Sequence, residues 1–160
     1  NLYYRPRNRF IAEFIGSPKM NIIESNLTKE GSSHYVELFS KKIKLPDFKI
    51  KDLLEKGVEE GKILLGIRAE EFNYDKESDI KVKFSNVEYM GSDTYGYTRT
   101  DRGETIVIRF DSKDPILVDK EIPISINEKN IYIFDIETEI CISFPEKNVD
   151  PIKLQEVIDA

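Results

Sequence analysis

The stretch Pro6–Asn21 reads PRNRFIAEFIGSPKMN, and the fold of this 160-residue chain is best approached from it. Two apolar pairs, Phe10-Ile11 and Phe14-Ile15, stand four residues apart, so they fall on one side of a helix. Asn8 is suited to cap the first turn, since its side chain can accept from an unpaired backbone N–H. Gly16-Ser17-Pro18 ends the pattern, because glycine suits the residue after a helix and proline cannot continue one. The stretch therefore predicts a short helix whose apolar stripe packs on the rest of the chain.

Short apolar or alternating runs follow this helix and predict a chain built mainly of strands. Ile80–Phe84 alternates strictly, so that its apolar side chains share one face. Similar runs stand at 35–38, 43–45, 95–97, 106–108, 122–124, 131–134 and 140–144. About eight short strands with close turns favour a barrel or a sandwich over a parallel sheet with crossover helices.

Two further helices are predicted from their capping residues. Asp47 is suited to cap a helix that has apolar residues at positions 50, 53 and 54 and that ends at Gly57. Near the end of the sequence, Asp150-Pro151 supplies a cap followed by a proline at the first helical position. We therefore expect a helix in the last ten residues or so.

The composition is typical of one globular domain. Hydrophobic residues make up 39% and charged residues 34%, and the net charge of −6 argues against broad binding to a phosphate backbone. The single cysteine, Cys141, excludes an internal disulfide and favours a reducing compartment. Since no apolar stretch approaches the length of a membrane span, we expect a cytosolic domain.

The residues that carry catalysis or bind metals do not form a recognisable site. Gly57–Ile63 has one residue too few between its glycines for a phosphate-binding loop. It also ends in isoleucine, where such a loop needs a residue with a hydroxyl group. Asp75–Asp79 imitates the start of a calcium loop, but the required glycine and final glutamate are missing. His34 and Cys141 do not make a triad or a zinc site, and Glu70-Glu71 is interpreted as a surface feature. The chain is predicted not to be an enzyme, with no catalytic, cofactor-binding or metal-binding residues.

The opening stretch also resembles a known family. Pro6–Asn21 is similar to the pattern P-x-N-x-F-V-A-x-F-I-G-S-P-x-M-N, from which only Ile11 departs. This pattern follows the nucleotide-binding domain in the ATP-binding subunits of carbohydrate ABC importers of the maltose and glycerol-3-phosphate type.

Three later stretches resemble the same family in the same order. Gly66–Glu70 resembles G-I-R-P-E with alanine for proline, and Val87–Tyr95 resembles V-E-x-x-G-x-[ED]-x-Y. Ile131–Glu139 resembles h-H-L-F-D-x-x-T-G, with tyrosine for histidine and glutamate for the final glycine. The resemblance spans about Tyr3 to Cys141.

The resemblance implies a mainly β fold: an OB-like (TOBE) β-barrel assembly with short flanking helices. It implies that residues 1–20 form a linker helix after an ATPase domain that this sequence does not contain. Residues 21–143 would be the OB-like (TOBE) regulatory domain, and residues 144–160 a C-terminal extension, expected to be helical.

The family also implies a non-catalytic regulatory and dimerisation role in an importer of sugars or related solutes. ATP and Mg would belong to the upstream ATPase domain, and this part would carry no cofactor. The implied partners are a second copy, the membrane-spanning permease subunits through the ATPase domain, and a regulatory protein in some members. The full subunit would lie at the cytoplasmic face of the inner membrane.

The motif residues are the candidate interface residues, although turns, close packing and strand ends also account for residues of these types. They are Asn8, Phe10, Phe14, Gly16, Ser17, Pro18, Met20, Asn21, Gly66, Arg68, Glu70, Gly91, Asp93, Tyr95, Phe134 and Asp135.

Two other functions stay open at this point. An OB-like module could bind single-stranded nucleic acid by stacking bases on Tyr95 and Tyr97, with Arg99 and Arg109 nearby, although the acidic balance opposes it. Alternating aromatic residues are also more often packed between sheets. Alternatively, a small oxyanion could bind near Gly91-Ser92 and Thr94, as in the molybdate-binding relatives of this domain type.

Overall fold

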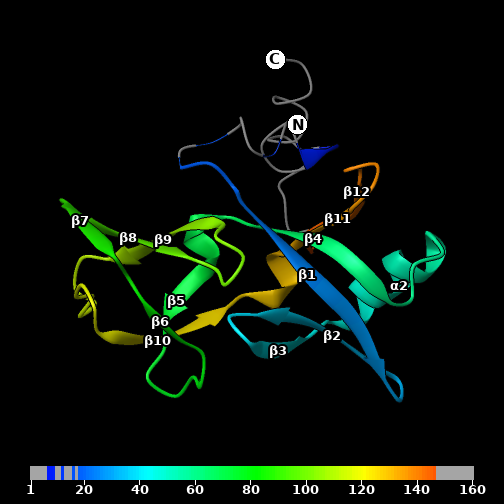
Figure 1. Ribbon diagram of the computed structural model, residues 1–160, viewed down its shortest axis with the longest axis horizontal. Helices are drawn as coiled ribbons and strands as arrows, with labels where there is room; N and C mark the ends of the chain where they lie inside the picture. Colours follow the sequence, from blue (N-terminus) through cyan, green and yellow to red (C-terminus); the bar gives the residue numbers. More distant parts are fainter. Residues whose placement is uncertain (1–6, 10–11, 13–15, 17, 147–160) are drawn as a thin grey trace.

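The computed structural model describes residues 7–9, 12, 16 and 18–146. Phe10, Phe14, Ser17 and the C-terminal helix expected after Asp150 lie outside the described residues. Within them the chain is built mainly of antiparallel strands, which form three sheets (Figure 1). No helix in this part of the chain is long and apolar enough to cross a membrane.

The first half of the chain, joined by β11 and β12, forms a six-stranded sheet. Its strands follow the spatial order β12-β11-β4-β1-β2-β3, with every neighbouring pair antiparallel. The strands are β1 (Asn21–Glu30), β2 (Ser33–Leu38), β3 (Lys41–Lys44), β4 (Gly61–Ile67), β11 (Tyr132–Asp135) and β12 (Cys141–Ser143). The expected pairing of residues 35–38 with 43–45 is confirmed by the β2–β3 hairpin.

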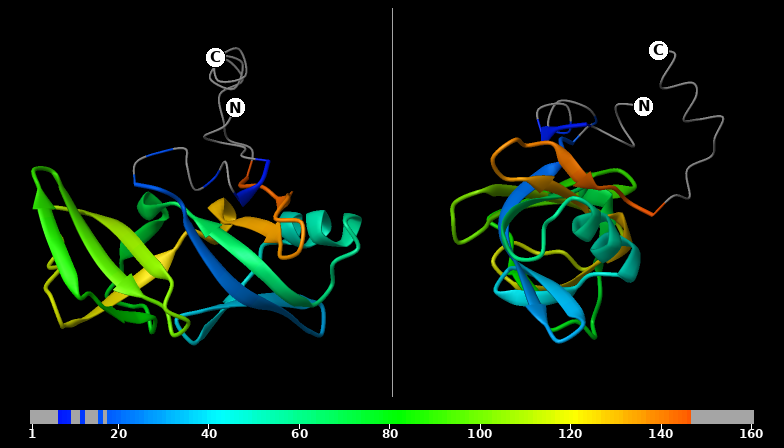
Figure 2. Two further views of the ribbon diagram at one scale, coloured as in Figure 1. Left: turned by 45° about the horizontal axis from the view of Figure 1, so that its top comes forward. Right: turned by 90° about the vertical axis from the view of Figure 1, so that its right-hand side faces the viewer.

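The second half of the chain forms two three-stranded sheets. One has the order β5-β10-β6, with β5 (Phe72–Tyr74), β10 (Glu121–Ile126) and β6 (Lys81–Lys83). The other has the order β7-β8-β9, with β7 (Asn86–Met90), β8 (Asp93–Arg99) and β9 (Thr105–Asp111). Short 3-10 turns at Ala69–Glu71 (η1) and Glu128–Asn130 (η2) connect the halves. Figure 2 shows the halves side by side along the long axis of the molecule.

Helix α2 (Asp47–Glu55) connects β3 to β4 and differs from the prediction at its start. Pro46 occupies the capping position, so Asp47 is the first helical residue, where its negative charge favours the helix N-terminus. Gly57 ends the helix as expected, with a φ of 74°. The Gly57 N–H donates to Leu54 O and the Val58 N–H donates to Leu53 O. This pair of hydrogen bonds is a Schellman motif.

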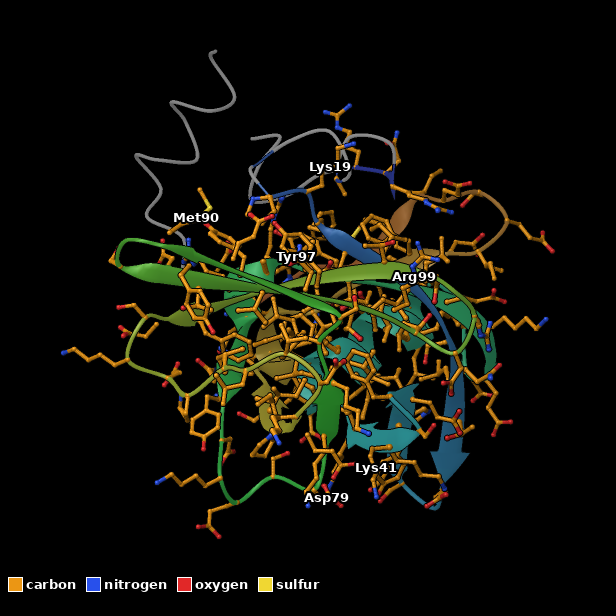
Figure 3. The ribbon with its side chains drawn as sticks, turned by 60° about the vertical axis from the view of Figure 1, so that its left-hand side comes forward. Lys19, Lys41, Asp79, Met90, Tyr97 and Arg99 are labelled. Carbon is orange, nitrogen blue, oxygen red and sulfur yellow. The ribbon has the colours of Figure 1, made fainter. Side chains whose placement is uncertain are left out.

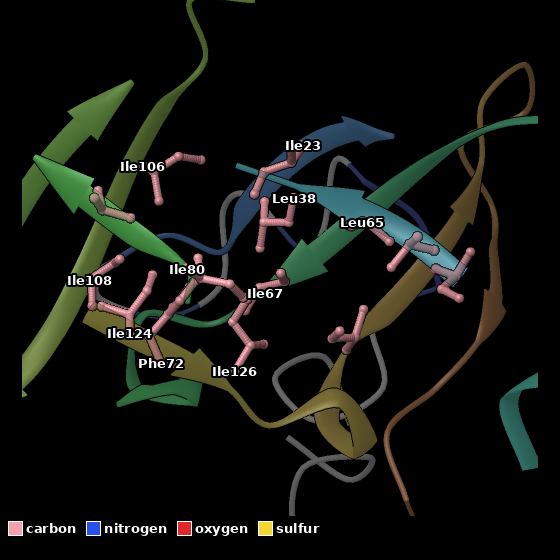
Figure 4. Packing of buried hydrophobic residues seen from close by; sticks show 14 of the residues in the cluster. Ile23, Leu38, Leu65, Ile67, Phe72, Ile80, Ile106, Ile108, Ile124 and Ile126 are labelled. Atoms are coloured by element: carbon pink, nitrogen blue, oxygen red, sulfur yellow. The ribbon is translucent and has the colours of Figure 1, made fainter. Parts of the chain in front are cut away.

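One apolar core runs through both halves of the chain. It contains Leu65 and Leu38 of the six-stranded sheet together with Ile108 and Ile124 of the other two sheets (Figure 4). Because burial of apolar surface is the main favourable contribution to folding, this shared core fixes the two halves against each other.

The mainly β, OB-like fold is confirmed, although the sheets formed by the described residues are open and do not close into one barrel. The longest strand, β1, has no counterpart in the runs picked out from the sequence. Its buried positions include Asn21 and Ser25, which hide the apolar alternation.

Candidate functional site

Three of the four motif stretches meet at one place, where the chain enters β1. Met20, Gly66 of β4 and Phe134 of β11 are far apart in sequence. A Cβ on Gly66 would nevertheless lie 2.6 Å from Met20 Sδ and 2.7 Å from Phe134 Cε2. Met20 and Phe134 belong to a small second core, with Ala12, Leu64, Tyr132 and Cys141. Gly66 and Phe134 therefore have the close-packing roles expected of them, and they hold the entry segment on the sheet.

Asn21 links the entry segment to the second half of the chain. It is 4% exposed, and its amide both donates to Val107 O and accepts from Val107 N, each at 2.8 Å. The Asn21 side chain thus pairs with both backbone groups of Val107, as a neighbouring strand would. Pro18, Asn21 and Glu104 line a cavity of about 520 Å³ beside this contact.

We expect Asn21→Ala to lower the free energy of unfolding by about 2 kcal/mol, since two hydrogen bonds of about 1 kcal/mol each are lost and two backbone groups are left unpaired. Urea unfolding measures the change. Asn26→Ala, on the same strand with a half-buried side chain, is the matched control. Equal effects of the two substitutions would show that the Asn21 contact does not stabilise the fold.

Residues 7–9 lie along the turn between β11 and β12. Asn8 forms a β-bridge with Ile140, the Cys141 N–H donates to Arg7 O at 2.8 Å, and the Arg9 N–H donates to Glu139 O at 2.9 Å. Asn8 O accepts from Ala12 N at 3.1 Å, as in a helical turn. The approach to β1 is thus bound by main-chain contacts to the far edge of the sheet.

Asp135 shapes that turn. Its Oδ1 accepts from Glu137 N at 2.9 Å, from Thr138 N at 2.8 Å and from the Thr138 hydroxyl at 3.2 Å. The hydrogen bond from the Thr138 N–H is the main cause that lowers the pKa of this carboxyl, and the bonds from the Thr138 hydroxyl and the Glu137 N–H lower it further. These bonds hold the chain in the turn that follows β11.

The remaining motif residues gather in the second half of the chain. Glu70 and Asp93 line a cavity of about 260 Å³ together with Arg109. Gly91 forms the β7–β8 turn with a φ of 66°, and Tyr95 lies directly across from Arg109. Arg68 is 4% exposed and directly follows β4. Gly16, which lies outside this half of the chain, has a φ of 103°. The motif residues thus fall at two places and do not form a single site.

The nucleic-acid hypothesis is not supported by the faces of β8. Tyr95 and Tyr97 do not follow the general tendency of alternating aromatic residues to pack between sheets. Thr94, Gly96 and Thr98 occupy the buried positions, so both tyrosines face outward (Figure 3 labels Tyr97 and Arg99). Glu88 stands directly across from Tyr95 and accepts from the Tyr97 hydroxyl at 3.4 Å. An acidic group at the centre of this face opposes a phosphate backbone.

The oxyanion hypothesis fails on geometry. Thr94 is fully buried on the inner face of β8, whereas Gly91 and Ser92 are exposed in the turn. These groups therefore cannot surround one anion.

Sequence reasoning missed a buried cation. Lys49 of α2 is 0% exposed, and its ammonium donates to Phe144 O at 2.8 Å and to Ser143 Oγ at 3.3 Å. The Ser143 hydroxyl in turn donates to Asp52 Oδ2 at 3.0 Å. Burial lowers the pKa of Lys49 to about 7, against smaller opposing effects of Cys141 and Asp52. This network ties α2 to the end of β12.

Comparisons with known proteins agree with this architecture. Residues 16–72 match the MalK OB fold domain, and residues 65–134 match the TOBE domain. The oligosaccharides import ATP-binding protein MsmX of Bacillus subtilis is 30% identical over 147 residues, which are 88% of this chain and 39% of MsmX.

Two further relatives align over a similar share. The multiple sugar-binding transport ATP-binding protein MsmK of Streptococcus mutans is 31% identical over 150 residues, 88% of this chain and 38% of its own length. The uncharacterized ABC transporter ATP-binding protein YcjV of Escherichia coli K12 is 32% identical over 143 residues, again 88% and 38%. The chain thus spans about two fifths of the length of these relatives. It belongs to the family of MalK OB fold and TOBE domains found in the ATP-binding proteins of sugar ABC importers.

Proposed function

We propose that this chain is the non-catalytic regulatory region of the ATP-binding subunit of an ABC importer for sugars or related solutes. The observation that carries the proposal is the order of two domains, MalK OB fold and then TOBE, within a chain that aligns almost throughout with MsmX and MsmK. In the full subunit, ATP and Mg bind to a nucleotide-binding domain upstream of Asn1. That domain contacts the permease subunits at the cytoplasmic face of the membrane.

The proposed mechanical role is to join two ATP-binding subunits through their regulatory regions while the nucleotide-binding domains open and close. The packing of Met20 against Gly66 and the bonds of Asn21 to Val107 support this role. They fix the direction in which the chain leaves the preceding segment, so movement at the junction is passed to both halves.

The upstream coding DNA tests the assignment. We expect an in-frame Walker A, signature and Walker B set before Asn1, and titration of the 160-residue chain with Mg-ATP should give no binding heat. A start codon close to Asn1, or tight nucleotide binding by the chain itself, would overturn the proposal.

Dimerisation requires a surface, and the exposed apolar residues around β7 are the best candidate. Tyr89, Met90, Leu117 and Val118 are between 44% and 65% exposed. The Tyr89 hydroxyl donates to Ile116 O at 2.8 Å, so β7 and the loop at 116–118 make one surface. Contiguous exposed apolar surface commonly marks a protein–protein contact, and a two-fold pair buries the same patch on each copy.

We expect the chain to self-associate in sedimentation equilibrium and Met90→Glu to weaken the dimer by about tenfold or more, because a charge is buried in an apolar contact. Leu54→Glu is the control, since Leu54 is 48% exposed on α2, in the other half of the chain. A monomer at all concentrations would refute dimerisation, and equal loss in both variants would refute the β7 surface. Neither outcome bears on the upstream ATPase domain.

A further inference from the structure

A polar cleft of about 410 Å³ lies between the two halves of the chain. One wall comes from β1 and the β2–β3 turn, with Glu24, Glu37 and Ser40. The other comes from β6, the end of β8 and the β8–β9 connection, with Lys81, Lys83 and Arg99. The first wall lies within the MalK OB fold match and the second within the TOBE match, so the cleft is a domain boundary, where ligand sites are frequent.

Most of the carboxylates in the cleft already have partners. Glu24 pairs with Arg102 at 2.8 Å, and Glu104 accepts from Glu24 N and from the Thr100 hydroxyl, both at 2.8 Å. Asp101 accepts from the Ser40 hydroxyl at 3.4 Å across the cleft. These contacts hold the two walls together and order the acidic side of the cleft.

The cations on the opposite wall have no such partners. Lys81, Lys83 and Arg99 are exposed, and among the described residues no carboxylate lies within 4.0 Å of their charged nitrogens. The Thr98 hydroxyl donates to Lys83 O at 2.8 Å, which joins the end of β8, beside Arg99, to β6. Lys81, Lys83 and Arg99 therefore line the cleft without a close ion pair, although Glu121 of β10 lies directly across from Lys83.

The turn between β2 and β3 gives the cleft a fixed rim. Phe39 and Ser40 have φ values of 50° and 65°, a backbone region that residues other than glycine seldom adopt. The adjacent Lys41 pairs with Asp79 at 3.9 Å and so joins this turn to the loop before β6 (Figure 3). The two walls are thus connected at Lys41–Asp79 and at Ser40–Asp101, and the cleft exists before a ligand enters.

We propose that this cleft binds a phosphate monoester of a small polyhydroxylated molecule, that is, a sugar phosphate. The guanidinium fork of Arg99 and the ammonium groups of Lys81 and Lys83 suit phosphate oxygens. The carboxylates of Glu37 and Asp101 accept from ligand hydroxyls, and they disfavour a bare anion on their side. The cleft volume exceeds what inorganic phosphate needs and lies in the usual range for small-molecule sites. The inference does not depend on the proposed transport role.

Calorimetric titration of the 160-residue chain with glucose 6-phosphate tests the site, with glucose and inorganic phosphate as comparison ligands. Glucose 6-phosphate should bind more tightly than either. The double substitution Lys83→Met with Arg99→Met should weaken its binding by tenfold or more, as each charged hydrogen bond is worth about 1.5–3 kcal/mol. Lys56→Met is the matched control, because Lys56 is exposed at the end of α2 and outside the cleft.

A second variant tests the acidic wall. Glu37→Ala should reduce the preference for glucose 6-phosphate over inorganic phosphate, because a hydroxyl acceptor and a repelling charge are both removed. Urea unfolding of each variant confirms that it is folded. The absence of binding to any of the three ligands, equal binding of inorganic phosphate and glucose 6-phosphate, or equal losses in the Lys56 control would each overturn the proposal.

Discussion

Replacing Gly96 by alanine is expected to lower the free energy of unfolding by about 3 kcal/mol, because the new methyl group has no space. A Cβ at this position would lie 2.7, 2.8 and 2.9 Å from three atoms of the Phe84 ring. Phe84 is 0% exposed and packs edge-on against Phe110 at 5.7 Å between ring centroids, so its ring cannot withdraw without disturbing the core. Urea unfolding measures the effect.

A double-mutant cycle identifies the cause. Phe84→Leu alone should destabilise the fold through a cavity, but Gly96→Ala should cost much less in the Phe84→Leu background than in the original chain. If the alanine costs the same in both backgrounds, contact with the Phe84 ring is not the reason for glycine at position 96.

The second large effect concerns Lys49 and depends on pH. In the unfolded chain a lysine has its ordinary pKa of 10.5, whereas burial lowers the pKa of Lys49 to about 7 in the fold. Between these values the unfolded chain binds more protons, so the contribution of Lys49 to stability rises with pH. The cost of burying the ammonium is fully present below pH 7 and is relieved as the pH approaches 10.5.

We therefore expect Lys49→Met to match or exceed the original chain in stability at pH 6, since an apolar side chain often replaces a buried charge without loss. Between pH 7 and pH 9 the original chain should gain about 2 kcal/mol relative to the variant, at up to about 1.4 kcal/mol per pH unit. Urea unfolding across this range measures the difference.

Lys51→Met on the same helix is the control, because Lys51 is exposed and should show no such dependence. A pH-independent difference between the original chain and Lys49→Met would mean that Lys49 keeps an ordinary pKa in the fold.

Apolar alternation predicted the strand at Ile80–Phe84, whereas inward polar residues hid strand β1. Ile80–Phe84 alternates strictly, and its apolar side chains are buried as expected. In β1 the inward Asn21 bonds to Val107, and the inward Ser25 both donates to Glu37 O at 2.7 Å and accepts from Glu37 N at 3.0 Å. Such partners come from distant segments, so local periodicity cannot reveal them.

The motif residues were found through family resemblance, but their grouping required the fold. Nothing in the spacing of Met20, Gly66 and Phe134 indicates that they touch, because strands β4 and β11 are brought together by a long connection. The outward position of Tyr97 also could not be predicted from the sequence. It follows from Gly96, whose missing side chain admits Phe84 on the inner face.

The continuous apolar core limits how such chains can be recombined. Ile23 and Leu65 of the first half share one cluster with Ile108 and Ile124 of the second. A hybrid could take residues up to 72 from one relative and the remaining residues from another. Its two apolar surfaces would then meet for the first time, because each had packed against a different partner surface in its own protein. The two matched domains are therefore separate as sequence patterns but inseparable as folding units, and an exchange between relatives must transfer both.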